Sequence, residues 1–295
     1  MTSFALVVNP TSGKGRAAAA AAVVQDRLAA AGHDVERLQG SDGADALRLC
    51  RAAVVNGVDA VVAVGGDGMA HLALQACAGT TTALGIVPTG TGNDLARALR
   101  LPLGEPSTSA DLLVDGVTRS VDAVRSGDIW WACVLGTGFD AAVNDRANRM
   151  TWPRGRRRYD IAVVTELRTY RAGRFVLHLD GARSEVDAML IAIGNAPSYG
   201  GGMKVCPDAL VDDGQLDVVV VGPMSRLRFL RLFPRVFAGT HVDVDVVSVQ
   251  RAREVRVEGP VGTNAYADGE PVGPLPLTAT VQPGALRVIG VPPGT

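Results

Sequence analysis

A short apolar run at residues 59–64, DAVVAV, constrains the fold of this chain more than any other feature. A run that is apolar almost throughout, without alternation, is typical of a strand buried on both faces of a parallel sheet. Similar runs at 4–8 and 83–87 alternate with helical stretches at 17–31 and 93–99. This strand–helix order predicts that roughly the first 120 residues form a doubly wound α/β domain.

The remainder of the chain shows a different pattern. After Asp122, short strand-like runs follow one another, separated in many places by turn residues, and two helical stretches near 159–171 and 225–237 interrupt them. This pattern predicts a mostly antiparallel β domain with helical insertions. Because 295 residues suffice for two ordinary domains, we expect an α/β domain at 1–122 and a β domain at 123–282.

Composition excludes several classes of protein. A hydrophobic share of 47% excludes global disorder, and a net charge of −1 gives no general attraction to nucleic acid or to an anionic membrane. The four cysteines are widely spaced, which predicts buried thiols rather than disulfides or a zinc site. No signal peptide is recognisable, and no apolar run approaches the roughly 20 residues of a membrane span. We therefore expect a soluble cytoplasmic protein without a nucleic-acid partner.

Three glycine-bearing loops follow three strands of the expected α/β domain: NPTSGKG at 9–15, GGDG at 65–68 and GTGND at 90–94. Ligands of open α/β sheets bind beyond the carboxyl ends of the strands. Glycine lets the backbone approach a ligand, and the N–H groups of a following helix favour phosphate. The three loops together predict a phosphate site, although each one alone is also compatible with a tight turn. The motifs GxxxxGK[ST] and GxGxxG are absent.

Two acids stand inside these loops, Asp67 and Asp94. A carboxylate beside phosphate is repelled unless a cation lies between them, so the acids predict Mg²⁺ at this edge of the sheet. The alternative for Asp94 is an acid in the first turn of the next helix, which is a common role.

The motifs in their order carry a resemblance. NPTSGKG, GGDG and PTGTGND, then IGNAPSYGGG at 193–202, CPDALVDDGQLD at 206–217 and DGE at 268–270, resemble the diacylglycerol kinase catalytic domain family. GGDG is shared with NAD kinases and phosphofructokinases, whereas GTGND combined with the later segments is specific. The stretch 138–166 is most similar to actinobacterial diacylglycerol kinases.

The resemblance implies a fold and an activity. The implied fold is an α/β nucleotide-binding domain, a β-sandwich domain and an active site in the cleft between them, with segment 283–295 returning to the first domain. The implied reaction transfers phosphate from ATP to 1,2-diacylglycerol, giving phosphatidate. Alternatives are a kinase for another hydroxyl lipid, such as a sphingoid base or a monoacylglycerol, and a non-catalytic nucleotide-binding regulator. A NAD kinase-like enzyme is disfavoured by the GTGND and YGGGM segments.

The resemblance also assigns roles to residues. Glu270 would be the general base, and Asp67, Asp94 and Asp122 would hold Mg²⁺ directly or through water; Asp122 could equally cap a turn. The ATP site would be lined by Asn9, Pro10, Thr11, Ser12, Gly13, Ser41, Gly66, Asp67, Gly68, Gly90 and Thr91. A second, structural Mg²⁺ would be held by Leu210, Asp213 and Gln215; without the resemblance, residues 212–214 are interpreted as a β-turn.

The chain departs from the family pattern after GGDG. Where the family has Thr, Asn and Glu, this chain has Met69, His71 and Leu72. We expect the substitution at Leu72 to remove a polar contact near the nucleotide. His71 is predicted to be a helix-surface or partly buried residue rather than a catalyst.

Two basic stretches next to aromatic residues, at 226–237 and 154–158, are candidate contacts with an anionic membrane. The alternative is an ordinary packed helix and a solvated loop. The expected partners are therefore a diacylglycerol substrate at the inner face of the membrane and, as is common in the family, a second copy of the chain.

Overall fold

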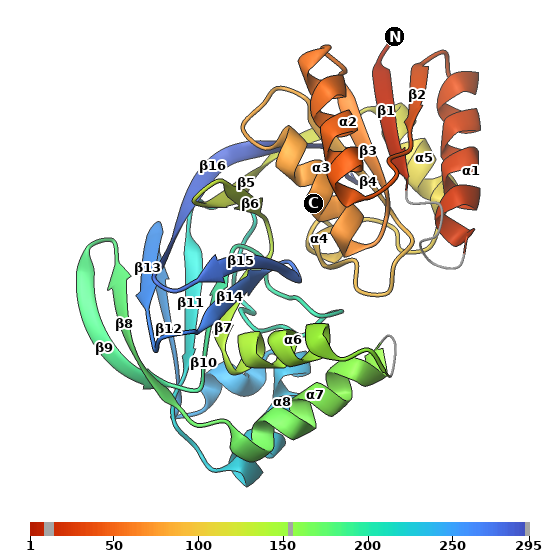
Figure 1. The fold of residues 1–295 in the computed structure, drawn as a ribbon. Coiled ribbons are helices and arrows are strands. Elements are labelled where there is room, and N and C mark those ends of the chain that lie inside the picture. Colours follow the sequence, from red (N-terminus) through yellow and green to blue (C-terminus); the bar gives the residue numbers. More distant parts are fainter. Residues whose placement is uncertain (9–14, 153–155, 293–295) are drawn as a thin grey trace.

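The computed structural model describes residues 1–8, 15–152 and 156–292. Figure 1 shows two bodies, an α/β domain with the N-terminus and a β-rich domain with three helices on its outer side, joined by the long strand β16.

The first domain contains a parallel sheet in the order β2-β1-β3-β4. Its strands are β1 (Ser3–Val8), β2 (Asp34–Leu38), β3 (Ala60–Gly65) and β4 (Ala83–Pro88), and its helices are α1 (Arg16–Ala30), α2 (Gly43–Val55), α3 (Asp67–Cys77), α4 (Asp94–Ala98) and α5 (Pro106–Asp115).

Both faces of this sheet are covered, as the run at 59–64 predicts. Leu6 and Val62 pack against Leu28 of α1 and Leu113 of α5. Neighbouring residues such as Val61 face α2 and α3 on the opposite side of the sheet (Figure 1). Alternate residues of one strand therefore enter two separate cores, which requires an apolar residue at every position. The predicted doubly wound domain is confirmed.

The second domain is a sandwich of two sheets. One is antiparallel, in the order β12-β11-β10-β7-β14-β15, and the other continues the parallel sheet through β16-β13-β8-β9. Its strands are β5 (Thr118–Ser126), β6 (Ile129–Trp131), β7 (Val134–Gly138), β8 (Gly173–Leu179), β9 (Ala182–Ala188), β10 (Leu190–Gly194), β11 (Leu216–Val221), β12 (Val247–Ala252), β13 (Glu254–Glu258), β14 (Asn264–Ala267), β15 (Glu270–Pro274) and β16 (Leu277–Ile289). Phe175 and Leu177 of one sheet share a core with Ile191 and Ile193 of the other, so the predicted sandwich is confirmed.

Strand β16 belongs to both domains. It pairs with β13 near its start, bends where its register with β5 shifts between Gln282 and Leu286, and meets β4 through the pair Val288 and Leu84. This pairing places Val288 beside the sheet of the first domain, and the return of the whole segment 283–295 stays a prediction. The domain boundaries expected from the sequence stay a prediction.

The three remaining helices are α6 (Phe139–Arg149), α7 (Arg156–Thr169) and α8 (Arg226–Ala238), followed by the short 3₁₀ helix Thr240–Asp243. Phe139 lies at their centre, with ring centroids 4.9 Å from Phe229 and 5.4 Å from Tyr170. None of the described helices combines the length and the apolar character that a membrane crossing requires. The four cysteines are free and buried, as predicted.

Candidate active site

The loops after β3 and β4 are joined by the carboxylate of Asp67. Its Oδ2 accepts a hydrogen bond from the backbone N–H of Asn93 at 2.9 Å, and its Oδ1 accepts one from the N–H of Asp94 at 2.7 Å. Asp67 is the first residue of α3 and Asp94 the first residue of α4. The carboxylate thus binds N–H groups at the start of a helix, which have no partner within the helix.

The glycines of these loops are required by loop-to-loop packing. A Cβ on Gly90 would lie 2.6 Å from Cα of Gly66, and a Cβ on Gly92 would lie 2.4 Å from Oδ2 of Asp67. Both distances are far shorter than a van der Waals contact. The two backbones touch directly, so the structure adds a second reason for glycine here besides the approach of a ligand.

Asn93 closes the second loop and is absent from the predicted site. Its backbone is left-handed, with φ of 55°, and only 7% of its surface is exposed. Its Oδ1 accepts the N–H of Gly90 at 3.1 Å, and its Nδ2 donates to the carbonyl of Gly90 at 3.0 Å. Asparagine tolerates the left-handed region better than most residues. An asparagine directly after a glycine-rich loop could therefore have been identified from the sequence as part of the site.

Asp94 reaches the second domain. Its carboxylate oxygens accept the N–H of Gly201 at 2.9 and 3.2 Å. Burial raises the pKa of the Asp94 carboxyl to about 6, and the negative charge of Asp67 adds to this shift, while hydrogen bonds from Gly200, Gly201 and Gly202 oppose it. The two predicted acids therefore lie close enough for the charge of Asp67 to affect the pKa of Asp94.

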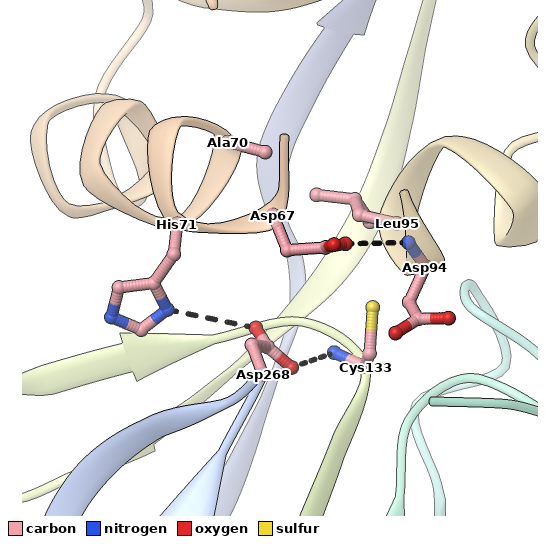
Figure 2. A pocket seen from close by; sticks show the side chains of 7 residues that line it. All are labelled: Asp67, Ala70, His71, Asp94, Leu95, Cys133 and Asp268. Atoms are coloured by element: carbon pink, nitrogen blue, oxygen red, sulfur yellow. Dashed lines mark hydrogen bonds and ion pairs between the residues drawn. The ribbon is translucent and has the colours of Figure 1, made fainter. Parts of the chain in front are cut away.

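A small cavity of about 20 Å³ lies between the two domains at this point. Figure 2 shows the side chains around it, which come from α3, α4 and the second domain. The lining residues are Asp67, Ala70, His71, Asp94, Leu95, Cys133 and Asp268. Its volume suits one water molecule or one ion, and three of its lining residues are carboxylic acids.

Magnesium fits this cavity by charge. Burial is the main cause of the raised pKa of Asp94 and the negative charge of Asp67 adds to it, and a cation between the two carboxylates would oppose both effects. Within the described residues, however, no group of three or more His, Cys, Asp and Glu side chains could hold a metal ion. Mg²⁺ is commonly bound by one or two carboxylates together with substrate phosphates, so Asp67 and Asp94 suit a Mg²⁺ that arrives with a nucleotide.

The turn between β14 and β15 brings Glu270 close to Gly68 at the start of α3. Asp268 and Gly269 at this turn have φ of 54° and 85°, as tight hairpin turns require. The Asp268 carboxylate accepts the N–H groups of Ala132 at 2.8 Å and Cys133 at 2.9 Å, which fixes the turn. A Cβ on Gly68 would lie 3.5 Å from Oε1 of Glu270. The predicted base of the second domain thus lies beside the GGDG loop of the first.

His71 is partly buried, as predicted, but it also lines the cavity. Its Nδ1 lies 3.8 Å from Oδ2 of Asp268 and has no hydrogen-bond partner, although it is buried. Its Nε2 lies 3.2 Å from Nε2 of Gln75. Leu72 packs against the apolar core of the first domain.

Asp122 is placed apart from this cavity. It is 3% exposed, and its two oxygens accept the N–H groups of Gly214 at 2.7 Å and Gly284 at 2.8 Å. These bonds tie β5 to the loop before β11 and to the bend in β16. The contacts support the alternative that Asp122 holds a turn at the domain junction.

The predicted second metal site receives no support from the arrangement of its residues. Oδ1 of Asp213 accepts the N–H of Gln215 at 3.0 Å, and the other oxygen pairs with the guanidinium of Arg251. Arg251 also binds Asp217 at 2.8 Å, and the Leu210 residue is 57% exposed. The Asp213 carboxylate thus already has two partners, and the second metal site, in which the backbone carbonyls of Leu210 and Gln215 would complete the ligands, stays a prediction.

The remaining predicted nucleotide contacts are residues 9–13, Ser41 and Thr91. Residues 9–13 lie outside the described part of the chain. Ser41 is exposed, and its N–H donates to Oδ2 of Asp45 at 3.0 Å at the start of α2. Thr91 is exposed in the loop after β4. The structure therefore brings together Gly66, Asp67, Gly68, Gly90, Asp94 and Glu270.

Comparisons with known proteins cover both domains. A family model for the diacylglycerol kinase catalytic domain matches residues 3–126, and a model for the YegS C-terminal NAD kinase beta sandwich-like domain matches residues 133–290. A diacylglycerol kinase of Mycobacterium tuberculosis (strain ATCC 25618 / H37Rv) is 48% identical, over 96% of this chain and 93% of the relative. A probable lipid kinase YegS-like of Chromohalobacter salexigens is 29% identical, over 88% and 85%.

A solved structure has the same fold. The crystal structure of a diacylglycerol kinase from Bacillus anthracis str. Sterne superposes with a TM-score of 0.76 and 21% identity, covering 99% of this chain and 97% of that one. At this identity the likeness concerns the fold alone.

Proposed function

The chain belongs to the diacylglycerol kinase catalytic domain family, and we propose that it is a lipid kinase that transfers the γ-phosphate of ATP to the free hydroxyl of 1,2-diacylglycerol. The observation that carries this proposal is the position of Glu270, whose Oε1 lies beside Gly68 across the domain boundary. A general base must lie within reach of both the acceptor hydroxyl and the phosphate loop. The names of the relatives support the substrate class.

The proposed step is a direct transfer. Glu270 takes the proton of the lipid hydroxyl while that oxygen forms a bond to the γ-phosphorus of ATP. The bond between the γ-phosphorus and the oxygen of the β-phosphate breaks, and ADP leaves with that electron pair. Glu270 is exposed in the structure, so it is accessible to a substrate from outside.

Asp67 and Asp94 are the residues proposed to hold Mg²⁺. The ion, when bound, would neutralise part of the charge of the β- and γ-phosphates. Contacts within the chain position both side chains: Asp67 fixes the start of α4, and Asp94 links that helix to Gly201 in the second domain. Both carboxylates are thereby held on the side of the cavity that belongs to the glycine loops.

Helix α8 is proposed as the contact with the membrane that contains the substrate. Its side chains Leu227, Leu230, Phe233 and Phe237 are 38–57% exposed, along one stripe of the helix. Arg226 and Arg231 flank the stripe, and none of the described carboxylates pairs with them. An exposed apolar stripe bordered by arginine complements an anionic lipid surface.

The experiment that tests the function is transfer of labelled γ-phosphate from ATP to a panel of lipids in mixed micelles, with and without Mg²⁺. The control is Glu270→Gln, which keeps the size of the side chain but cannot accept the proton. We expect label in phosphatidate and its loss in the variant. Label in another lipid alone would change the substrate, and ATP binding without any transfer would favour the non-catalytic regulator.

A further inference from the structure

A second cavity lies next to the candidate active site, close to the Asp94–Gly201 contact. Its volume is about 450 Å³, and it is formed by the end of α4 with the residues that follow it, and by the loop after β10. We call it the basic groove; its lining residues are Arg97, Ala98, Arg100, Leu101, Leu103, Pro197, Ser198, Gly202 and Lys204.

The groove has a strongly positive lining. Both domains contribute cations, Arg97 and Arg100 from the first and Lys204 from the second, and no lining residue is acidic. Arg97 donates from Nε to the carbonyl of Gly92 at 2.8 Å. No carboxylate in the described part of the chain pairs with Arg100 or Lys204. Cations gathered in one concave site without carboxylate partners favour a multiply charged anion.

The backbone of Arg100 gives an independent indication. Its φ is 57°, in the left-handed region, and it directly follows the end of α4. Glycine is the usual residue at such a position, because a side chain there is strained. Strain of this kind is often found where a side chain has a function, and the Arg100 side chain lines the groove.

The groove is also suited to an apolar group. Leu101 is buried, and Leu103, Ala98 and Pro197 contribute further apolar surface. Two residues place the groove beside the active site. Arg97 lies one helical turn after Asp94, and Gly202 directly follows Gly201, whose N–H binds Asp94. A ligand would thus have an anionic group next to the transfer site and an apolar remainder.

We propose that the basic groove binds the phosphate monoester of the phosphorylated lipid product. This inference rests on the proposed function. A phosphate monoester carries a charge of about −1.5 to −2 near neutral pH and three oxygens that accept hydrogen bonds, which suits three cations better than the single charge of a phosphodiester lipid. Free inorganic phosphate has the same headgroup chemistry but lacks the apolar part, so binding can distinguish the two sources.

The test is a calorimetric titration of the full chain with dihexanoyl phosphatidate below its micelle concentration, without nucleotide. The variant is Arg100→Gly with Lys204→Met: glycine suits the left-handed backbone, and methionine keeps the apolar stem that packs near Gly239. A matched control is Arg51→Gln, an exposed arginine on α2. We expect Kd to rise at least about tenfold in the double variant, because each charged hydrogen bond contributes strongly, and to stay unchanged in the control.

Three companion ligands make the outcome decisive. Dihexanoyl phosphatidylglycerol and inorganic phosphate should each bind more weakly than phosphatidate. Equal binding of inorganic phosphate would assign the groove to free phosphate, and equal binding of phosphatidylglycerol would assign it to phosphodiester lipids; either result overturns the proposal. Displacement of phosphatidate by ATP, with an equal loss of ATP affinity in the double variant, would assign the groove to the nucleotide and also overturn it.

An unchanged Kd in the double variant would overturn the proposal directly. A thermal midpoint no lower than that of the unmodified chain verifies that the variant is folded, since glycine relieves the strain at position 100. The titration requires no turnover, so a failed kinase assay and a failed titration are separate results and test the function and the groove independently.

Discussion

The carboxylate of Asp67 accepts the backbone N–H of Asp94 at 2.7 Å, so the first residues of two different helices are joined directly. The second oxygen of Asp67 binds the neighbouring N–H of Asn93. As a consequence the loops after β3 and β4 form one unit, and the two acids face the same cavity. Their positions relative to each other are fixed by the hydrogen bonds that the Asp67 side chain accepts from the backbone at the start of α4.

The packing of Gly90 against Gly66 gives the first prediction. In Gly90→Ala the new Cβ would lie 2.6 Å from the Gly66 Cα and 2.8 Å from Oδ1 of Asn93. The two loops must separate, which should lower the free energy of unfolding by roughly 1–3 kcal/mol and abolish transfer. Urea denaturation and the lipid kinase assay measure the two effects.

A matched control is Gly43→Ala, at the start of α2, where a Cβ would meet nothing within 4 Å. This change should leave the free energy of unfolding unchanged or raise it by up to about 1 kcal/mol. If Gly90→Ala behaved like Gly43→Ala, the direct contact between the loops would be wrong.

Asp140 gives a prediction about pH. Its Oδ1 accepts the hydroxyl of Tyr199 at 2.7 Å, and burial raises the pKa of its carboxyl from 3.8 to about 6. Since the folded-state pKa is higher than the unfolded one, the folded state binds the proton more tightly. Its contribution to stability is complete below pH 4 and is lost as pH rises through 6.

Asp140→Asn removes this titration and keeps an oxygen that accepts the Tyr199 hydroxyl. At pH 8 the variant should be more stable than the unmodified chain by up to about 3 kcal/mol, from roughly two pKa units, and near pH 4 the difference should vanish. Chemical denaturation at both pH values measures it. Asp128→Asn, at a fully exposed side chain, should show no such dependence, and an equal gain at both pH values would contradict the prediction.

The fold could be predicted largely because its signals are local. The apolar run at 59–64 requires two covered faces, and the structure has them in the separate cores around Leu6 and Val61. The short runs of the second half form the predicted sandwich. The loops after β3 and β4 meet, and Glu270 lies beside Gly68.

Contacts between distant residues could not be predicted in the same way. The roles of Asn93 and Asp268 depend on backbone groups that fold next to them, and the sequence shows only that both residues tolerate a left-handed backbone. The sequence alone also does not show whether an aspartate binds a metal ion or a backbone N–H group. Asp122 binds two such N–H groups, and Asp213 binds Arg251, so for these residues the motif alone does not identify the partner.

The turn that carries Glu270 provides the third prediction. Asp268 accepts two backbone N–H groups, one on each oxygen. In Asp268→Asn one of these donors would face an amide NH₂ group, which should cost about 1–3 kcal/mol of stability and lower kcat by displacing Glu270. Thermal denaturation and kinase kinetics measure both effects.

A comparable turn away from the site is the control. Asp180 also has a left-handed backbone in a hairpin, but its Oδ1 alone accepts the N–H groups of Arg253 and Glu254, each at 2.9 Å. Asp180→Asn keeps that oxygen, so stability and kcat should hardly change. Similar kinetics in the two variants would show that the Asp268 contacts do not position Glu270.

The exposed stripe of α8 provides the last prediction. Leu230→Gln with Phe233→Gln removes two side chains that are 51% and 38% exposed and carry little of the protein core. If the stripe inserts into lipid, the loss of buried apolar area should weaken binding to vesicles containing anionic phospholipid by about tenfold or more. Flotation with such vesicles measures the bound fraction.

Two comparisons separate membrane contact from catalysis. Val261→Gln, at a fully exposed residue in the second domain, should leave flotation unchanged. The α8 variant should retain its kcat on a short-chain diacylglycerol that needs no membrane, because α8 contributes no residue to the cavity between the domains. Arg226 and Arg231 are exposed, so vesicle binding should also fall as ionic strength rises. Flotation that is equal for the α8 variant and the unmodified chain would exclude this helix as the docking surface.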